Sequence, residues 1–233
     1  MGPMRYAITG TGRGLGLEFV RQLLHRGDTI DAGVRVPAEA SALQDLSRQS
    51  GGRLRLHALD TSKGESVEAF AAVVGEGEPV DVLINNAGVH GRTGPLAELD
   101  FEDMLRTYTV NTLGPLRLTA ALLPALRRSA VRRIVHLSSS MGSIGDNSWG
   151  GSYGYRLSKA ALNMAMRNLH VELHGEGFIT IALHPGWAQT DMGGPSAPVP
   201  VPESVRGMLQ VIDGLTPERS GRFWAYDGQE LAW

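Results

Sequence analysis

The residues Thr9-Gly10-Thr11-Gly12-Arg13-Gly14-Leu15-Gly16 place four glycines within one short turn. An apolar run, Arg5–Thr9, precedes the turn, and apolar side chains at helical spacing follow it as far as Gly27. Glycines between a strand and a helix let the backbone approach a pyrophosphate, and the helix N-terminus adds unpaired N–H groups. No Gly-Lys-Ser/Thr follows, which excludes a P-loop. By itself the turn is equally consistent with a tight strand-to-helix connection.

Outward from this turn, short apolar runs alternate with helical patterns along the chain. The runs expected to be strands are Arg5–Thr9, Thr29–Val34, Leu54–Leu59, Val80–Asn85, Arg133–Leu137, Ile179–Leu183 and Arg222–Tyr226. Such alternation is typical of a parallel sheet covered on both faces. We therefore predict an α/β fold: one Rossmann-type, doubly wound domain over residues 1–233, with a seven-stranded parallel sheet and helices on both faces.

Local signals predict where several helices begin and end. Ser62-Lys63-Gly64-Glu65 has the pattern of a capping box, and Asp100 is expected to cap a long helix that runs through Asn111 and bends at Pro115. Further helices are expected over Lys159–His174 and around Val205–Ile212. The proline-rich segment Gly193–Pro202 reads as loop, and we expect a short substrate loop at about 190–207.

Composition narrows the class of protein. The formal net charge is −2 and 20% of the residues are charged, with the two signs well mixed, so nothing favours binding to nucleic acid or to an anionic membrane. Cysteine is absent, which excludes disulfides and thiolate metal sites. No apolar run is long enough to span a membrane and no secretory signal pattern opens the sequence, so a cytoplasmic protein is expected.

Further motifs follow the glycine turn in a fixed order. They are Asn85-Asn86-Ala87-Gly88, Asn111, Ser138-Ser139-Ser140-Met141-Gly142, Tyr155-x-x-x-Lys159, and Pro185-Gly186 with Thr190. Together with Thr-Gly-x-x-x-Gly-x-Gly at the turn, this order resembles the short-chain dehydrogenase/reductase family over residues 5–190. The stretches 141–144, 155–163 and 190–194 are most similar to its C-factor and sniffer-like carbonyl reductase branch.

The resemblance implies a catalytic group of Asn111, Ser139, Tyr155 and Lys159. On a helix, Tyr155 and Lys159 share a face, and a tyrosine pKa of about 10 is too high for proton transfer at neutral pH. A lysine ammonium and a positively charged nicotinamide would lower that pKa. Tyr155 would then protonate a carbonyl oxygen held also by Ser139, while Lys159 binds the nicotinamide ribose and Asn111 holds a water linking Lys159 to solvent.

Two assignments inside these motifs leave alternatives open. Tyr153 lies close to Tyr155, but only Tyr155 has a lysine four residues later. The family pattern Ser-x-x-Gly selects Ser139 through Gly142. The gap from Ser139 to Tyr155 is longer than usual for the family, so Ser138 or Ser140 stays possible as the active serine.

Charge near the second strand predicts the coenzyme. Val34 stands where the family places an acid that binds the ribose of NAD, and Arg35 and Arg13 suit the 2′-phosphate of NADP. We therefore expect NADP(H) to be preferred over NAD(H); the alternative is that both arginines are solvated. Asp31 lies too early in the strand to replace the acid. The residues expected to bind coenzyme are Gly10, Thr11, Arg13, Gly14, Leu15, Gly16, Arg35, Asp60, Thr61, Asn86, Ala87, Gly88, Tyr155, Lys159, Pro185, Gly186 and Thr190.

The sequence also limits which ligands and partners are expected. The histidines show no metal-ligand spacing, so no metal site is expected, and His136 and His184 are interpreted as packed strand residues. The expected partner is a small carbonyl or alcohol substrate, and the resemblance implies a homodimer or homotetramer formed through the helices bearing Asn111 and Tyr155. An alternative function is that of a nucleotide-binding signalling protein of C-factor type, in which turnover is incidental.

Overall fold

Seven parallel strands form the centre of the computed structural model, which describes residues 2–233. The strands are β1 Arg5–Thr9, β2 Thr29–Val34, β3 Leu54–Ala58, β4 Val82–Asn85, β5 Arg133–Leu137, β6 Ile179–His184 and β7 Phe223–Ala225. Their order is β3-β2-β1-β4-β5-β6-β7, and every neighbouring pair is parallel. This confirms the predicted doubly wound, Rossmann-type sheet.

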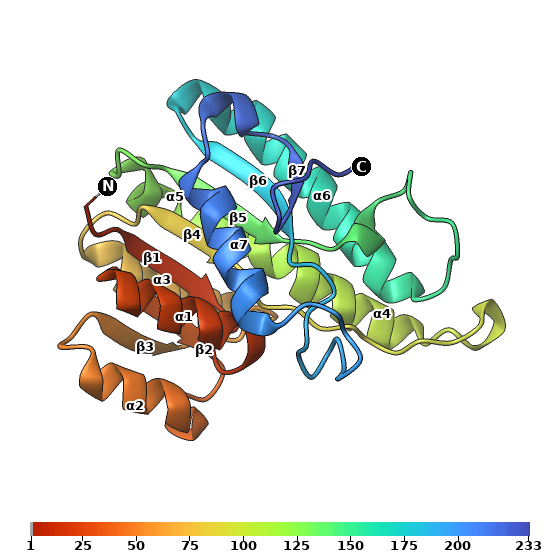
Figure 1. The fold of residues 1–233 in the computed structure, drawn as a ribbon, viewed down its shortest axis with the longest axis horizontal. Helices are drawn as coiled ribbons and strands as arrows, with labels where there is room; N and C mark the ends of the chain where they lie inside the picture. The colour runs from red at the N-terminus through yellow and green to blue at the C-terminus, as the bar shows by residue number, and fades with distance from the viewer. Residues whose placement is uncertain (1) are drawn as a thin grey trace.

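Helices cover both faces of the sheet, as expected (Figure 1). They are α1 Gly14–Arg26, α2 Ser41–Gln49, α3 Gly64–Glu76, α4 Phe101–Tyr108, α5 Gly114–Arg127, α6 Tyr153–Leu173 and α7 Val201–Asp213. Apolar side chains of α1, α2 and α7 pack on one face, and those of α3, α5 and the end of α6 pack on the other. Strands β1, β4, β5 and β6 are buried along almost their whole length, so their sequences are largely apolar, whereas the edge strand β3 is partly exposed and alternates apolar and polar residues.

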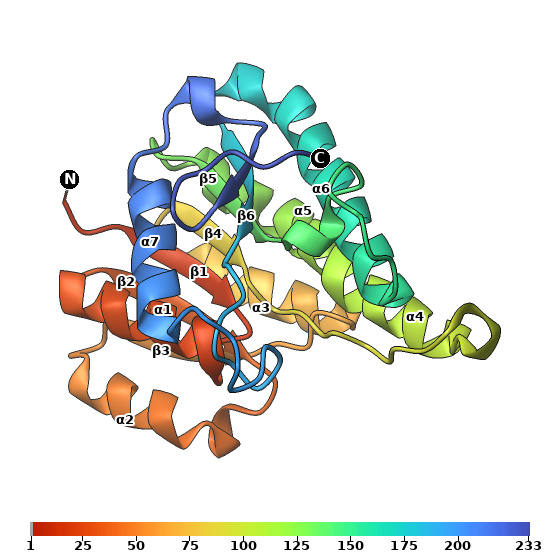
Figure 2. The ribbon, with the colours of Figure 1, turned by 45° about the vertical axis from the view of Figure 1, so that its right-hand side comes forward.

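The strand order reverses between β1 and β4, and in open α/β sheets such a reversal leaves a crevice at the carboxyl edge. In open α/β sheets, ligands bind at this switch point. The loop between β6 and α7 extends over the same edge and lies beside the start of α1 (Figure 2). The fold therefore brings the glycine turn, the end of β4 and this loop together.

Several local predictions differ from the structure. The capping box is wrong: Ser62 donates its hydroxyl to Asp60 Oδ1 at 2.6 Å, and Lys63 is the N-cap of α3 without a side-chain cap. Helix α6 begins at Tyr153 rather than Lys159, and α7 begins at Val201, so it takes up the second half of the expected substrate loop.

The long helix expected through Asn111 is divided. Asp100 does cap α4, because its carboxylate accepts the backbone N–H of Asp103 at 3.0 Å. A π-helical turn, Thr109–Leu113, then separates α4 from α5, and Pro115 lies in the first turn of α5. Proline has no N–H and is well tolerated at a helix start, so the irregularity precedes it rather than following as a bend.

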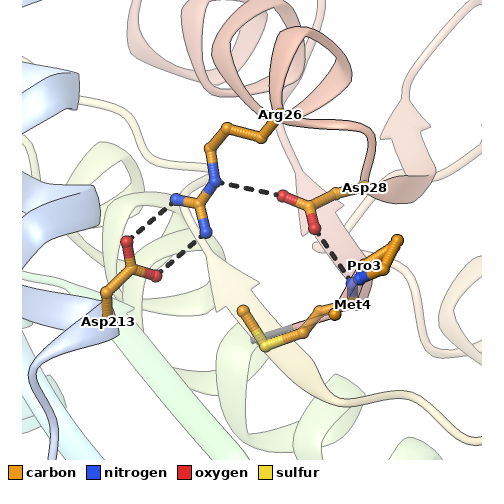
Figure 3. A pocket seen from close by; sticks show the side chains of 6 residues that line it. Pro3, Met4, Arg26, Asp28 and Asp213 are labelled. Atoms are coloured by element: carbon orange, nitrogen blue, oxygen red, sulfur yellow. Dashed lines mark hydrogen bonds and ion pairs between the residues drawn. The ribbon is translucent and has the colours of Figure 1, made fainter.

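A separate hollow of about 310 Å³ lies at the opposite, amino edge of the sheet. Its charged groups pair with each other: Arg26 binds Asp213 at 3.0 Å and approaches Asp28 to 3.3 Å, and Asp28 accepts the backbone N–H of Met4 at 2.9 Å (Figure 3). These bonds tie the ends of α1 and α7 to β1 and β2. The hollow therefore has a structural role, and the candidate active site lies at the carboxyl edge of the sheet.

Candidate active site

The ends of β1 and β4 are joined by Thr9 and the segment after β4. The Thr9 hydroxyl accepts the backbone N–H groups of Asn86 at 3.0 Å and Ala87 at 2.8 Å. The Asn86 amide donates to the Thr9 carbonyl at 2.7 Å. At Gly10, with φ of +68°, a Cβ would lie 2.8 Å from the Ala87 Cα, so only glycine fits. These contacts hold the glycine turn and the segment after β4 together at the carboxyl edge of the sheet.

The start of α1 is suited to an anion. Its N-cap, Arg13, makes no side-chain capping bond, and its first turn, from Gly14 through Leu15 and Gly16, holds no acidic residue. Uncapped N–H groups at a helix start carry partial positive charge and bind phosphate. Thr11 anchors the turn to β2, with its N–H and hydroxyl both donating to the Gly33 carbonyl. The residues present therefore fit the pyrophosphate of a dinucleotide.

Helix α6 brings Tyr155 and Lys159 to this crevice. The Lys159 ammonium lies 5.7 Å from the centre of the Tyr155 ring and donates to the Leu137 carbonyl at 2.7 Å. Its side chain is buried, and it forms no salt bridge among the described residues. Burial without a counter-ion lowers the Lys159 pKa to about 8. The Lys159 ammonium makes one hydrogen bond, so its other N–H groups remain available to donate to the hydroxyls of a ligand.

In the chain without coenzyme the pKa of Tyr155 is raised, whereas the lowering predicted from the sequence included the charge of a bound nicotinamide. Burial of the phenol raises the pKa of Tyr155, and the neighbouring Ser139 side chain opposes that shift. Lys159 does not offset the effect of burial, because it points at the Leu137 carbonyl and is itself desolvated. In the chain alone Tyr155 is therefore a protonated phenol at neutral pH.

The three serines after β5 have different surroundings. The Ser138 hydroxyl is buried and donates to Asn163 Oδ1 at 2.6 Å, while Ser140 is exposed. The Ser139 hydroxyl accepts the Met141 backbone N–H at 3.2 Å and lies beside Tyr155. The spacing to Gly142 has a steric reason, since a Cβ there would lie 2.8 Å from the Lys159 Cβ.

Asn111 lies in the π-helical turn, and its side-chain amide makes three hydrogen bonds. It accepts the Val89 backbone N–H at 2.8 Å and donates to the Val89 carbonyl at 2.8 Å and to the Ser158 hydroxyl at 3.0 Å. Its backbone carbonyl loses the ordinary helical partner, because Pro115 has no N–H. Gly88 lies next to this amide and to the Lys159 ammonium.

Charged residues follow both β2 and β3 at the carboxyl edge of the sheet. Arg35 is exposed and makes no hydrogen bond or salt bridge within residues 2–233, and its charge helps to lower the pKa of Asp60. Asp60 accepts the N–H and hydroxyl of Ser62, and this hydrogen bonding is the larger cause of that lowering. Asp31 faces the other way and binds Arg5, Arg55 and His57. Asp31 is thus not the missing acid.

The remaining residues expected to bind coenzyme lie at the far ends of this edge. Thr61 is buried against Gly114 of α5. Pro185 and Gly186 follow β6, with Gly186 at φ of +74°. Thr190 contacts the glycine turn, since a Cβ at Gly14 would lie 3.4 Å from its methyl. The structure therefore gathers all of the expected site residues along the carboxyl edge of one sheet.

His90 is a site residue that the sequence reasoning missed. Its imidazole stacks on the Tyr155 ring, with 4.7 Å between centroids and 23° between planes. The segment bearing it is held by α4, because the Arg92 N–H donates to Asp103 at 2.5 Å and the Arg92 side chain to Asp100 at 2.9 Å. Its position just after Asn85–Gly88, at the carboxyl edge, was the available signal.

Within the described part of the chain, no group of potential ligands is placed to hold a metal ion. Burial lowers the pKa of His136 to about 3 and that of His184 to about 4, so both are neutral strand residues. In the same residues, no helix is both long and apolar enough to cross a membrane.

The comparison with protein families agrees with this geometry. The model for short chain dehydrogenases matches residues 5–198. The chain belongs to this family. It is 60% identical to "C-signal" of Myxococcus xanthus over 167 residues, which covers 72% of this chain and all of that protein.

Solved structures of other members are closely similar. The carbonyl reductase Sniffer of D. melanogaster superposes with a TM-score of 0.95 at 34% identity, covering 99% of this chain and 100% of that one. The NADPH-bound carbonyl reductase from chicken fatty liver superposes with a TM-score of 0.94 at 37% identity, covering both chains completely. This short-chain dehydrogenase therefore has the architecture of the sniffer-like carbonyl reductases, and the resemblance seen in its sequence is confirmed.

Proposed function

We propose that this short-chain dehydrogenase is an NADPH-preferring carbonyl reductase, able to oxidise the corresponding alcohol in reverse. The observation that carries the proposal is the buried, unpaired Lys159 beside Tyr155. Burying a cation without a counter-ion costs stability, and such groups cluster at functional sites. Nothing in the packing of α6 requires the charge. Catalysis gives a reason for keeping it.

In the proposed reaction, each of the four candidate catalytic residues has a separate role. Tyr155, a phenol at neutral pH, donates its proton to the substrate carbonyl oxygen, and the Ser139 hydroxyl hydrogen-bonds the same oxygen. Lys159 supplies positive charge beneath Tyr155 and binds ribose hydroxyls, and Asn111 holds Val89 and offers its carbonyl to a water that reaches Lys159. When bound, NADPH supplies the hydride for the carbonyl carbon.

The preference for NADPH rests on two arginines. Arg35 stands unpaired after β2, Arg13 lies in the glycine turn next to Gly12, which faces Val34, and Val34 offers no acceptor for the ribose hydroxyls of NAD. The NADPH-bound chicken carbonyl reductase supports the same choice. We expect a preference of about 10- to 100-fold, because each well-formed charged contact contributes about 1.5–3 kcal/mol.

A signalling role is the second candidate, because the relative from Myxococcus xanthus carries the name C-signal. Binding a nucleotide for signalling needs the glycine turn but not a phenol aimed at a reacting oxygen. The coexistence of Tyr155, Ser139 and Lys159 at one edge therefore favours the reductase. We place the activity in the cytoplasm, which is consistent with the absence of cysteine.

We also propose that the protein forms homodimers or homotetramers through α4 and α6, which pack side by side. Large apolar side chains stand exposed along both helices: Phe101, Leu105 and Tyr108 on α4, and Leu157, Met164 and Val171 on α6. Two such stripes suit a second copy of the same face around a two-fold axis. Light scattering should give at least twice the mass of one chain, and Met164→Glu should reduce it; a monomeric native protein refutes the proposal.

The function is tested with a panel of aldehydes and ketones, NADPH or NADH, and the absorbance of the reduced nicotinamide. Native protein should consume NADPH with part of the panel. Tyr155→Phe should lower turnover by about 10²–10⁴-fold, and Tyr153→Phe, the matched control two residues away, should have little effect. A Tyr155→Phe variant as active as the native protein would exclude the assigned acid. Nucleotide binding without turnover of any substrate would favour the signalling role.

A further inference from the structure

Arg13 is already engaged in the chain alone. Its guanidinium Nη1 lies 2.7 Å from Asp191 Oδ2, and the two side chains are 76% and 72% exposed. The pair links the glycine turn to the loop between β6 and α7, two segments far apart in sequence. An arginine expected to receive a phosphate therefore has a competing carboxylate partner.

The backbone places Arg13 between two regions of the site. On one side the turn rests on β2, because a Cβ at Gly12 would lie 3.1 Å from a methyl of Val34, the residue before Arg35. On the other side, Gly14 faces Thr190, the residue before Asp191. A flexible arginine at this point can turn toward the adenosine ribose or toward the loop, but it cannot fully satisfy both.

We propose that Asp191 is a coenzyme-specificity residue that acts through Arg13. It holds the guanidinium at the loop, and the 2′-phosphate of NADP has to take Arg13 away from it. NAD, which has no 2′-phosphate, leaves the pair intact. This inference rests on the proposed binding of NADP, and it assigns to Asp191 a moderating effect on the preference for that coenzyme.

The expected effect is modest because the pair is exposed to solvent. Removing the charge of Asp191 should tighten NADP⁺ binding by about two- to fivefold, the range that an exposed ion pair gives, and should leave NAD⁺ binding unchanged. The gain should shrink as salt is raised, since exposed charges are screened. A purely structural role of Asp191 in the loop would change the binding of both coenzymes alike.

The experiment is calorimetric titration of NADP⁺ and NAD⁺ into native protein, Asp191→Asn, Arg13→Gln and the double variant. Asp146→Asn is the matched control, because it removes the same charge from an exposed loop that also follows a strand at this edge. We expect Asp191→Asn to raise the NADP⁺ to NAD⁺ affinity ratio by about two- to fivefold. The gain should vanish in the Arg13→Gln background, and Asp146→Asn should leave the ratio unchanged.

Three results would overturn the inference while leaving the proposed function standing. They are an unchanged ratio in Asp191→Asn, a gain that persists without Arg13, and an equal gain in Asp146→Asn. If native protein bound neither coenzyme, the proposed function itself would fail, and the role of Asp191 with it. The two failures are therefore distinguishable in one set of titrations.

Discussion

Ser138 and Ser139 are neighbours in sequence with opposite expected roles, so substituting each by alanine separates stability from catalysis. Ser138 donates to Asn163 Oδ1 at 2.6 Å in a buried site. Ser138→Ala leaves that amide oxygen without its donor, which should lower the free energy of unfolding by about 1–3 kcal/mol. For a chain of this size, that corresponds to a melting temperature lower by about 2–12 °C.

Ser139→Ala should have the reverse signature. Its hydroxyl accepts one N–H, that of Met141, through a long, partly buried bond of 3.2 Å, so the loss in stability should stay below about 1 kcal/mol. Turnover should fall by about 10²–10³-fold, the usual effect of removing a donor to a developing oxyanion.

The assay is NADPH-dependent carbonyl reduction at a temperature where both variants are folded, together with thermal unfolding followed by circular dichroism. Ser140→Ala, at an exposed position, serves as the control and should change neither quantity. A larger loss of turnover in Ser138→Ala than in Ser139→Ala, at equal folded fraction, would refute the assignment of the active serine.

Substitutions at four further places in the chain have effects whose direction follows from the structure. Lys159→Met should abolish turnover yet raise the free energy of unfolding at pH 7 by about 3 kcal/mol, because burial lowers the Lys159 pKa to about 8 from 10.5. In native protein, denaturant titrations should show the free energy of unfolding rising between pH 8 and pH 10.5. Asp31→Asn should cost about 3–5 kcal/mol at pH 7 by leaving buried Arg5 unpaired. Because the Asp31 pKa is lowered in the fold, its stabilisation is lost as pH falls below about 4, and the variant should show a smaller acid-induced loss in the same titrations. Val34→Asp with Arg35→Ser should reverse the kcat/KM ratio for NADPH and NADH; an unchanged ratio would contradict the arginine assignment. His90→Ala should lower kcat with little change in coenzyme affinity, and His90→Phe should restore it if stacking on Tyr155 is what matters.

The positions of most strands could be predicted because the buried parallel strands have largely apolar sequences. The end of α1 at Gly27 was equally clear, since a φ of 91° there needs glycine. Helix α2 was missed because it is short and buries only Leu43 completely, so its apolar face is too small to stand out in the sequence. The capping box failed because Lys63, one residue later than expected, is the N-cap of α3, while Ser62 lies before the helix and donates to Asp60.

The sequence could nominate most of the candidate site residues, but not His90 and not the electrostatic surroundings of the others. Tyr155 and Lys159 could be paired from their spacing alone, and Gly142 could be linked to Ser139 only through the family pattern. That a side chain at Gly142 would strike Lys159 is a fact of the folded chain. The stacking of His90, the capture of Arg13 by Asp191 and the upward shift of the Tyr155 pKa depend on contacts between segments distant in sequence.

Burial determines the protonation state of Tyr155 in the chain without coenzyme at neutral pH. Reduction needs a proton donor, and burial keeps Tyr155 protonated, so the group is ready without prior ionisation. Oxidation needs the phenolate, which burial disfavours and which Lys159 supports only while it is charged, below a pKa of about 8. As pH rises, Lys159 loses its charge before Tyr155 gains one, so alkaline conditions alone do not prepare the base. The proposed carbonyl reduction would therefore have its proton donor in place, whereas oxidation would require positive charge beyond that of Lys159 next to the phenol.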